Sequence, residues 1–428
     1  MGLIIMKYDL LIHKGFDKKD IVTVIDENYF PACFFLDGHM GCTFSSKAFS
    51  TRLSYGKTLL FIYRYFTAKS IELPDCVSTG RFLDKSEYDD FKRYCSYKVI
   101  HELEQTNSVI SFEKMSHKQL SNLINNTKAS EDKVSSNTIK QRLMRFKGYI
   151  EYLYNCFHLA NNPPAQLSHS YANFNKMLDN DIRSLKEQNT EVNDPFEQAI
   201  PDKVFFNLLE ITKPHHEDNP FQSNKLRNRA IIMVFVETGI RIGALAKLKI
   251  CDVRDDWHNP RMLITRTPDD PTDPRRIKPQ QKTKPHASSL TRDTTELLKL
   301  YIKTDRNRHN ESHTHDFIFV GDKGQTKGLP LSTLRIYQII KSLSKAVNFN
   351  LHPHLFRHKW NEILTQRARD KGYSMAETED MRNYGQGWTE NSSMSGTYNK
   401  KEQAVRIQEL SNQRQGEFAP KIGGDDGL

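Results

Sequence analysis

The sequence predicts a mainly α-helical protein with a small β-sheet, divided into two principal domains. The chain has 428 residues, more than one compact hydrophobic core usually organises, so two domains, or at most three, are expected. Apolar residues recur at helical spacing through much of residues 45–190. In the second half, two short β-prone runs at 262–265 and 286–290 predict a hairpin among helices.

The composition excludes several classes of protein. A hydrophobic fraction of 37% and an aromatic fraction of 10% argue against disorder over most of the length. No apolar run approaches the roughly 20 residues that a membrane span needs. The six cysteines are scattered without a closely spaced pair, which fits reduced thiols and argues against a structural zinc site. We therefore expect a cytoplasmic protein that needs no metal and contacts no membrane.

The charge balance is basic, with a net charge of +10 at pH 7. Such a balance is typical of proteins with a polyanionic partner, either nucleic acid or an anionic membrane surface. A merely basic soluble protein has the same balance, so charge alone does not separate these explanations.

Residues 1–44 are expected to form an N-terminal appendage that contains β-structure. Short β-prone runs at 21–25 and 33–36 lie between turn residues. This segment carries no motif that suggests a function.

Residues 45–190 are expected to form a helical domain. Apolar residues from Phe49 to Phe66 recur on a helical period, and further helices are predicted at 85–100, from Asn137 onward, and at 171–187. Asn137 is a suitable N-cap for the third of these helices.

Basic residues lie off the apolar stripes of these helices. They are Arg52, Lys57, Lys140, Arg142, Arg145 and Lys147. A basic face opposite a core face suits a helix that lies against a DNA backbone or groove. For any single helix a solvated charged face is the commoner explanation, so the motifs below are needed to favour DNA.

A polar linker at 188–200 leads into a second domain over 195–413. Its predicted elements are helices at 224–237, 291–304, 331–346 and 400–413, a short helix that starts at Arg241, the hairpin, and a strand at 317–320. The hairpin encloses an unusually long loop at 269–276. The tail at 414–428 is polar and glycine-rich, so it is expected to be mobile.

Three short motifs in this second domain carry residues suited to phosphate chemistry. They span 237–245, 354–358 and 387–398, and contain Arg241, His354 with Arg357, and Trp388 with Tyr398. An arginine offers a planar fork of donors to phosphate oxygens, and a histidine exchanges a proton near neutrality. Each residue alone has an ordinary structural explanation, such as a salt-bridged arginine or a half-buried tyrosine. Their joint occurrence in this order argues for a site.

In order and separation, these motifs resemble the three signature boxes of the tyrosine recombinase (phage integrase) family. The resemblance covers roughly residues 195–410 and is fainter before that. It implies a helical core-binding domain and a mixed α/β catalytic domain that close as a clamp on double-stranded DNA. It also implies a homotetramer that holds two DNA sites, with or without a partner recombinase.

The resemblance implies site-specific cleavage and rejoining of DNA without metal or nucleotide cofactor. A tyrosine attacks a backbone phosphodiester and forms a 3′-phosphotyrosine, which keeps the bond energy for religation. By position, Tyr398 is the nucleophile, and Arg241 and Arg357 stabilise the charged transition state. His354 contacts the phosphate, and Trp388 stands where the family has His or Trp.

The lysine that protonates the leaving 5′-oxygen has the vaguest motif. Lys282 is our choice, and Lys284 and Lys278 are the alternatives. The chain also departs from the family pattern at Ala244, where an acidic residue is usual. Gln386 offers an alternative donor to Trp388, and His358 is expected to play a packing role.

A recombinase or integrase is the leading functional hypothesis. A transposase, or an enzyme that resolves telomeres, would use the same chemistry. A catalytically inactive DNA-binding regulator on the same scaffold is disfavoured, because the arginines, lysine, histidine and tyrosine are all present. A type IB topoisomerase also shares the chemistry but needs no defined pair of sites.

Overall fold

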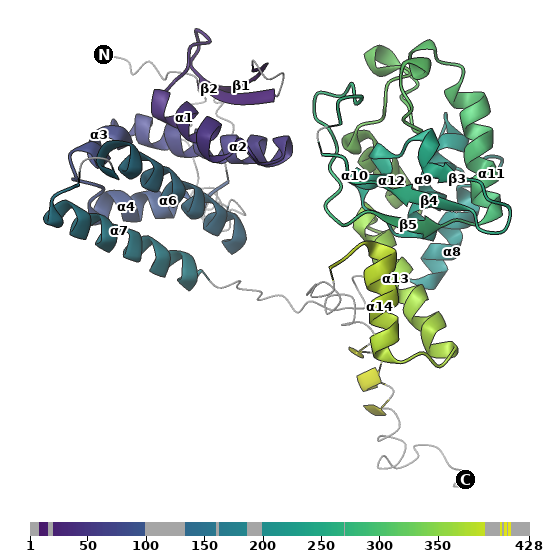
Figure 1. Cartoon of the computed structure of the whole chain (residues 1–428). Helices are drawn as coiled ribbons and strands as arrows, with labels where there is room; N and C mark the ends of the chain where they lie inside the picture. The colour runs from purple at the N-terminus through teal and green to yellow at the C-terminus, as the bar shows by residue number, and fades with distance from the viewer. Residues whose placement is uncertain are drawn as a thin grey trace, which may run out of the picture. The chain divides into compact units, whose positions relative to one another are not determined.

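The chain folds into two compact units, Met1–Glu191 and Val192–Leu428 (Figure 1). The computed structural model describes residues 8–15, 20–98, 133–159, 162–185, 199–268, 270–389, 403–404, 406–408 and 410–411. Helices dominate both units, and each unit contains one small antiparallel sheet. Among the described residues, no helix is long and apolar enough to cross a membrane. The predicted fold class, mainly α with small sheets, is confirmed.

The N-terminal unit begins with a hairpin and continues with helices. The hairpin pairs β1 (Asp9–Lys14) with β2 (Asp20–Ile25) in antiparallel register, so that Asp9 faces Ile25. The helices are α1 (Phe34–Thr43), α2 (Phe49–Ala68), α3 (Leu73–Ser78), α4 (Lys85–Tyr94), α6 (Ser136–His158) and α7 (Ala165–Ser184). The run at 21–25 is a strand as predicted, but the run at 33–36 lies at the start of a helix.

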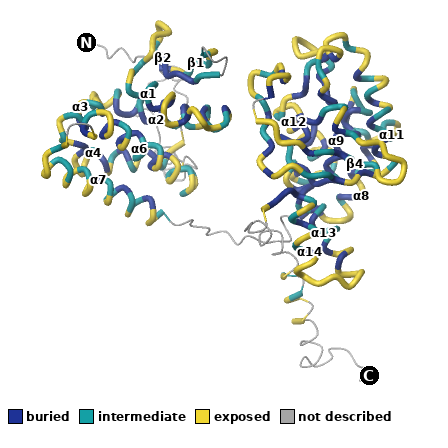
Figure 2. The backbone as a smooth tube through the Cα atoms, in the orientation of Figure 1, coloured by how far each residue is buried: buried dark blue, intermediate teal, exposed yellow. Residues whose placement is uncertain are grey.

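One hydrophobic core joins the hairpin to the helices of this unit. Val22 and Val24 of β2, Leu36 and Met40 of α1, and Phe66 of α2 are buried in the same cluster, which Figure 2 shows as the dark blue interior. The hairpin and α1, within the stretch 1–44 that was predicted to be an N-terminal appendage, therefore share the core of the helical unit. Burial of these side chains against the helices is the main force that holds the hairpin and α1 in place.

The longest helix of the unit, α6, has a defined start. The Ser135 side chain accepts a hydrogen bond from the Thr138 amide, so Ser135 and not Asn137 is the N-cap. The apolar stripe of α6 is buried: Leu143, Phe146, Ile150 and Leu153 are almost wholly inaccessible. Phe146 stacks on Phe66 of α2 with ring centroids 5.6 Å apart.

The C-terminal unit surrounds a three-stranded antiparallel sheet with helices (Figure 1). The sheet consists of β3 (Val253–Arg254), β4 (Arg261–Ile264) and β5 (His286–Ser289), and Met262 pairs with Ser288. The helices are α8 (Asp202–Ile211), α9 (Lys225–Thr238), α10 (Ile242–Lys247), α11 (Arg292–Tyr301), α12 (Thr333–Ala346), α13 (Pro353–Asp370) and α14 (Met375–Gln386). The predicted hairpin is thus confirmed as β4 and β5.

Shorter helical turns complete this unit. They are η4 (Ile250–Asp252), η5 (Ile302–Arg306), η6 (Asn310–Thr314) and η7 (Gly324–Thr326). The predicted strand at 317–320 forms only isolated bridges, from Phe317 to Lys249 and from Val320 to Pro330. The segment is buried, so its apolar composition reflects core packing and not membership of the sheet.

The long loop between β4 and β5 is held against the helices of the unit. Arg275 forms an ion pair with Asp273 at 2.7 Å and donates to the Ala246 carbonyl at 2.9 Å. Lys249 pairs with Asp270, also at 2.7 Å. Because Asp270 and Asp273 are buried, these pairs compensate charges that would be costly to leave alone. The loop is therefore part of the packed unit.

Candidate active site

The three predicted motifs lie at the ends of three helices of the C-terminal unit. Helix α9 ends at Gly239, whose φ of 58° lies in the left-handed region that glycine tolerates. The chain then turns, and Arg241 stands immediately before α10. Pro353 opens α13, which places His354 and Arg357 in its first turns. Helix α14 ends at Gly387, also left-handed, and Trp388 follows.

Arg357 connects the first and third motifs. Only 2% of its surface is exposed. Its Nη1 donates to the Gly239 carbonyl at 3.1 Å, and its Nη2 donates to the Gln386 carbonyl at 3.3 Å. Its guanidinium carbon lies 5.2 Å from the centre of the Trp388 ring, a favourable cation–π distance. A buried guanidinium held on three sides is preorganised, so it would reorganise little when it binds an anion.

His354 lies in the same positive environment but remains accessible. Its side chain is exposed, and its ring contacts that of His358 edge-on with centroids 5.1 Å apart. The pKa of His354 is lowered to about 4 by partial burial and by nearby His358, Arg357 and Arg241. Water screens part of this effect at an exposed ring. The ring is neutral at pH 7, so one nitrogen donates a hydrogen bond and the other accepts one.

The lowered pKa values of His354 and His358 make the stability of the C-terminal unit depend on pH. Burial, followed by the nearby His352 and Arg357, lowers the pKa of His358 to about 4, while unfolded histidines titrate near about 6.5. The unfolded chain therefore binds more protons between these values, and stability is lost as pH falls from about 6.5 to 4. We expect the thermal midpoint of the C-terminal unit to drop by several degrees between pH 7 and pH 5. His358→Gln should flatten this dependence, whereas the exposed His313→Gln should leave it unchanged, as calorimetry would reveal.

A strap formed by residues 280–286 passes between the first and third motifs. Near its start, a β-carbon added at Gly243 would lie 2.4 Å from the Gln280 carbonyl oxygen, so strap and α10 are in direct contact. Near its end, the Lys284 amide donates to the Gly387 carbonyl at 2.8 Å. Anchors at both ends make the strap a defined part of the site.

The three candidate lysines differ in their exposure and in their position relative to the strap. Gln281 and Thr283 are buried, whereas Lys282 and Lys284 alternate with them and are exposed. Lys282 lies between the anchor beside Arg241 and the anchor beside Trp388. Lys278 lies before the strap, and its ammonium donates to the Asp270 carbonyl at 2.8 Å. Lys282 and Lys284 therefore remain candidates, and Lys278 is the weakest of the three.

The two departures from the expected pattern lie in the interior. Ala244 belongs to the hydrophobic core of the unit, so an acidic side chain there would have to be buried. Gln386 is fully buried, and its amide nitrogen lies close to Gly239. Trp388 is itself buried under Arg357, so its first role in the protein alone is to support that guanidinium.

Tyr398 lies outside the described residues, as does half of the predicted helix at 400–413. The assignment of Tyr398 as nucleophile stays a prediction from the motif.

Most of the basic residues predicted to face DNA in the N-terminal unit have partners inside that unit. Arg52 donates to the Asp20 carbonyl at 2.7 Å. Arg142, 8% exposed, donates to the Cys95 and Tyr97 carbonyls and stacks on Phe61. The expectation that Arg52 and Arg142 face DNA is therefore not supported, because their guanidinium groups bond buried backbone.

The remaining basic residues divide into two pairs. Arg145 stacks on the Tyr55 ring at 3.8 Å, and Lys147 pairs with Asp179 at 2.6 Å. Lys57 and Lys140 are exposed. These two lysines are the members of the set that project into solvent.

Substitutions at Arg142 and Lys140 should therefore have different effects. Arg142→Ala leaves two carbonyls without their donor, so we expect a loss of about 2–4 kcal/mol in the unfolding free energy of the N-terminal unit. Lys140→Ala should leave stability unchanged and weaken DNA binding, reducing the salt dependence of affinity by about one counterion. Denaturant unfolding and binding titrations at several salt concentrations would measure both. A stable Arg142→Ala protein with weakened DNA binding would restore Arg142 to the DNA-facing set.

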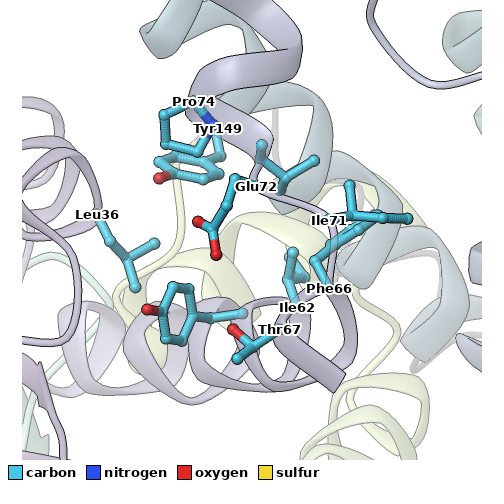
Figure 3. A pocket seen from close by; sticks show the side chains of 10 residues that line it. Leu36, Ile62, Phe66, Thr67, Ile71, Glu72, Pro74 and Tyr149 are labelled. Atoms are coloured by element: carbon cyan, nitrogen blue, oxygen red, sulfur yellow. The ribbon is translucent and has the colours of Figure 1, made fainter. Parts of the chain in front are cut away.

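A small pocket in the N-terminal unit lies apart from these residues. It is formed by α1, α2, the start of α3 and α6, and its lining is mostly apolar, including Leu36, Ile62 and Phe66. Figure 3 shows the Glu72 carboxylate pointing into this space beside the aromatic rings. None of the predicted catalytic or DNA-facing residues lines it.

His286, the first residue of β5 and the last of the strap, was not predicted from the sequence as a site residue. Its pKa is lowered by burial, and Arg357 and Arg241 lower it further, which places it beside both predicted arginines. A histidine two residues after a candidate lysine was the available signal. The sequence did not reveal that β5 begins beside Gly387.

Comparisons with known proteins agree with this site. Residues 203–374 match the model of the phage integrase family, a range that contains Arg241, Lys282, His354 and Arg357. The tyrosine recombinase XerD of Halalkalibacterium halodurans is 25% identical over 147 residues, which are 34% of this chain and 42% of that protein. Transposase A from transposon Tn554 of Staphylococcus aureus is 26% identical over 147 residues, 34% of this chain and 38% of that protein.

The match thus spans about two fifths of the length of these curated relatives. Among solved structures, the Tn1549 transposon integrase in complex with circular intermediate DNA superposes with a TM-score of 0.48 at 13% identity, covering 88% of this chain and 98% of that one. XerA recombinase superposes with a TM-score of 0.36 at 14% identity, covering 91% and 98%. On these sequence matches, residues 203–374 of this chain are similar to the phage integrase family, and the stretch that matches contains the two predicted arginines.

Proposed function

We propose that this protein is a site-specific DNA recombinase that cleaves and rejoins DNA through a 3′-phosphotyrosine at Tyr398. The observation that supports this best is the convergence of Arg241, His354 and Arg357. Two motifs that lie far apart in the sequence bring two guanidinium groups and an accessible imidazole into one electrostatic environment. Such an arrangement suits the binding of a phosphodiester whose charge grows in the transition state.

The proposed reaction conserves the energy of the phosphodiester. The Tyr398 phenol gives its proton to water and its oxygen attacks phosphorus, while the bond from phosphorus to the 5′-oxygen breaks. Arg241 and Arg357 stabilise the non-bridging oxygens, and His354 contacts them from the accessible face of α13. Lys282 donates a proton to the departing 5′-oxygen. Rejoining reverses these steps, with a 5′-hydroxyl as the attacking group.

The proposed partner is double-stranded DNA, held by both units with four protomers on two sites. The basic net charge and the exposed Lys57 and Lys140 support DNA binding. One of the relatives is a transposase, which supports a role in the movement of a genetic element. An integrase and a transposase share the chemistry at the phosphate, so the difference between them lies in the DNA sites.

Capture of covalent adducts tests the proposed function directly. The full-length protein would be incubated with fragmented genomic DNA and denatured, and DNA that remains attached to protein would be sequenced. Adducts enriched at a small set of related sequences are expected, and their junctions would identify both sites. Stable DNA binding without any adduct would instead indicate the inactive regulator, and adducts spread over arbitrary sequence would indicate a topoisomerase.

Chelation provides a further prediction. Since two arginines and a lysine supply the positive charge in the proposed mechanism, adduct formation should persist at an unchanged rate in excess EDTA. A single-turnover time course with and without chelator would measure this. Strict dependence of the covalent step on magnesium would contradict the mechanism.

A further inference from the structure

His286 occupies a position that brings it against the third motif. It is the first residue of β5 and pairs across the sheet with Ile264. A β-carbon added at Gly387 would lie 2.5 Å from Nδ1 of His286 and 2.4 Å from the Lys284 carbonyl oxygen. Glycine at 387 therefore allows the imidazole to approach the backbone immediately before Trp388.

The hydrogen bonds of the ring determine its tautomer. Nδ1 lies 3.0 Å from the Lys284 carbonyl oxygen, and a carbonyl only accepts, so Nδ1 carries the proton. In a neutral ring Nε2 is then an acceptor. Nε2 is buried and forms no hydrogen bond with any described residue. A buried acceptor without a partner is uncommon, and it suggests that this nitrogen serves a ligand.

The groups packed around His286 explain why the ring is neutral in the protein alone. Arg241 before α10 and Arg357 of α13 both lower its pKa, after burial. Ile264 on β4 and Gly387 on α14 contribute no charge. The Glu237 carboxylate on α9 accepts hydrogen bonds from the hydroxyls of Thr291 and Thr294 and is not among the groups that shift the pKa of His286. The hydrogen bond to the Lys284 carbonyl raises the pKa of His286, but burial and the two arginines outweigh it.

A bound phosphodiester would change the electrostatic balance that keeps the His286 ring neutral. Its negative charge, placed between the arginines, would offset the field that keeps the ring neutral and so raise the pKa of His286. Protonated at Nε2, the ring becomes a donor on both nitrogens while the bond from Nδ1 to Lys284 is kept. Trp388, by contrast, has a single indole N–H, which donates a hydrogen bond but does not titrate near neutral pH.

We infer that His286 is a further phosphate-contacting residue, which takes up a proton from solvent as DNA binds and donates it in a hydrogen bond to a non-bridging oxygen. The inference rests on the proposed function, because it assigns His286 to the same phosphate. Strand β5 thereby supplies a titratable donor beside the place where the third motif carries an indole. The proton is not transferred to the oxygen, so the covalent steps proposed above are unchanged.

The variants that test the role of His286 differ in whether they keep a hydrogen-bond donor and whether that donor titrates. His286→Leu keeps the approximate volume and loses the donor, whereas His286→Gln keeps an amide donor that does not titrate. Ser289→Ala, at an exposed position of the same strand, is the matched control for disturbance of β5. Thermal unfolding of all three variants would confirm that each is folded at the assay temperature.

Single-turnover adduct formation on a captured DNA site gives the first measurement. We expect His286→Leu to be roughly 10²-fold slower than the wild type, with His286→Gln between them and Ser289→Ala unchanged. The ratio of the wild-type rate to the His286→Gln rate should fall as pH rises from 6 to 9, because only the imidazole loses its proton. A merely structural role would slow both variants equally and leave that ratio flat, which would overturn the inference.

Histidine titration in a non-cleaving background gives the second measurement. In Tyr398→Phe protein with isotope-labelled histidine rings, the captured duplex should move the His286 titration to higher pH. An unchanged titration with DNA shown to be bound would overturn the inference while leaving the proposed function intact. A wild-type protein that forms no adduct with any DNA would overturn the proposed function first, and this inference with it.

Discussion

Replacement of Tyr398 by phenylalanine is expected to abolish covalent attachment to DNA while leaving DNA binding intact. The substitution removes only the phenolic oxygen, the atom proposed to attack phosphorus, so no weaker nucleophile remains on the side chain. The arginines and His354 would still hold the phosphate. A denaturing gel of the captured duplex should show no shifted band for the variant, and a native gel should show the same complex as the wild type.

Tyr384 provides the matched control for this experiment. It lies on α14, four residues before Trp388, and 70% of its surface is exposed. Tyr384→Phe should therefore form the adduct at the wild-type rate. If Tyr398→Phe keeps the adduct and Tyr384→Phe loses it, the nucleophile has been assigned to the wrong tyrosine.

The sequence predicted the hairpin of the C-terminal unit but not the start of α1, and the reason is physical. The runs at 262–265 and 286–290 owe their strand character to local β-propensity and flanking turn residues, and each pairs with the other. The run at 33–36 is apolar on both a helical and a strand period. The segment packs on α6 as a helix. Gly38 lies against the Tyr152 hydroxyl, a tertiary contact that cannot be inferred from the local sequence.

The same limit applies to the basic residues of the N-terminal unit. A helical period indicates that Arg142 lies off the apolar stripe, but it does not indicate which neighbour covers that side. The end of α4 covers it, and the Cys95 and Tyr97 carbonyls accept from the guanidinium. A long side chain at the edge of a core face can bury its charge in this way. Lys140, two residues earlier, is exposed because none of the described elements covers it.

Site residues that belong to a sequence motif could be predicted. Site residues that reach the site only through the folding of distant segments could not. Arg241, His354 and Arg357 were identified from the motifs, and the structure brings them into one environment. His286 depends on the start of β5 lying beside Gly387, through the hydrogen bond from Lys284. That contact joins residues roughly a hundred positions apart, and propensity carries no information about it.

The strap that positions His286 also presents Lys282, whose replacement is expected to have the second large effect. Without a proton donor, the 5′-oxygen leaves as an alkoxide, which is a very poor leaving group near neutral pH. A positioned ammonium that donates this proton typically contributes about 10²–10⁴-fold. Lys282→Ala should therefore form the adduct more slowly by a factor in that range, without loss of DNA binding.

A modified DNA distinguishes proton donation by Lys282 from electrostatic stabilisation of the transition state. When sulfur replaces the bridging 5′-oxygen, the leaving group is a thiolate, whose conjugate acid has a pKa of about 8.5, so it departs without a proton donor. Lys282→Ala should then react at nearly the wild-type rate. Arg357→Ala should stay slow on the same DNA, because the charge on the non-bridging oxygens is unaffected by the sulfur.

The neighbouring lysines complete the experiment, because Lys284 is exposed on the strap as Lys282 is. Lys284→Ala is expected to cleave ordinary DNA at close to the wild-type rate, and so is Lys278→Ala, whose ammonium is already bonded to the Asp270 carbonyl. If Lys284→Ala is instead the slow variant that sulfur restores, the general acid is the lysine anchored at Gly387 and Lys282 is its neighbour. If sulfur restores none of the three, the proton comes from outside the strap.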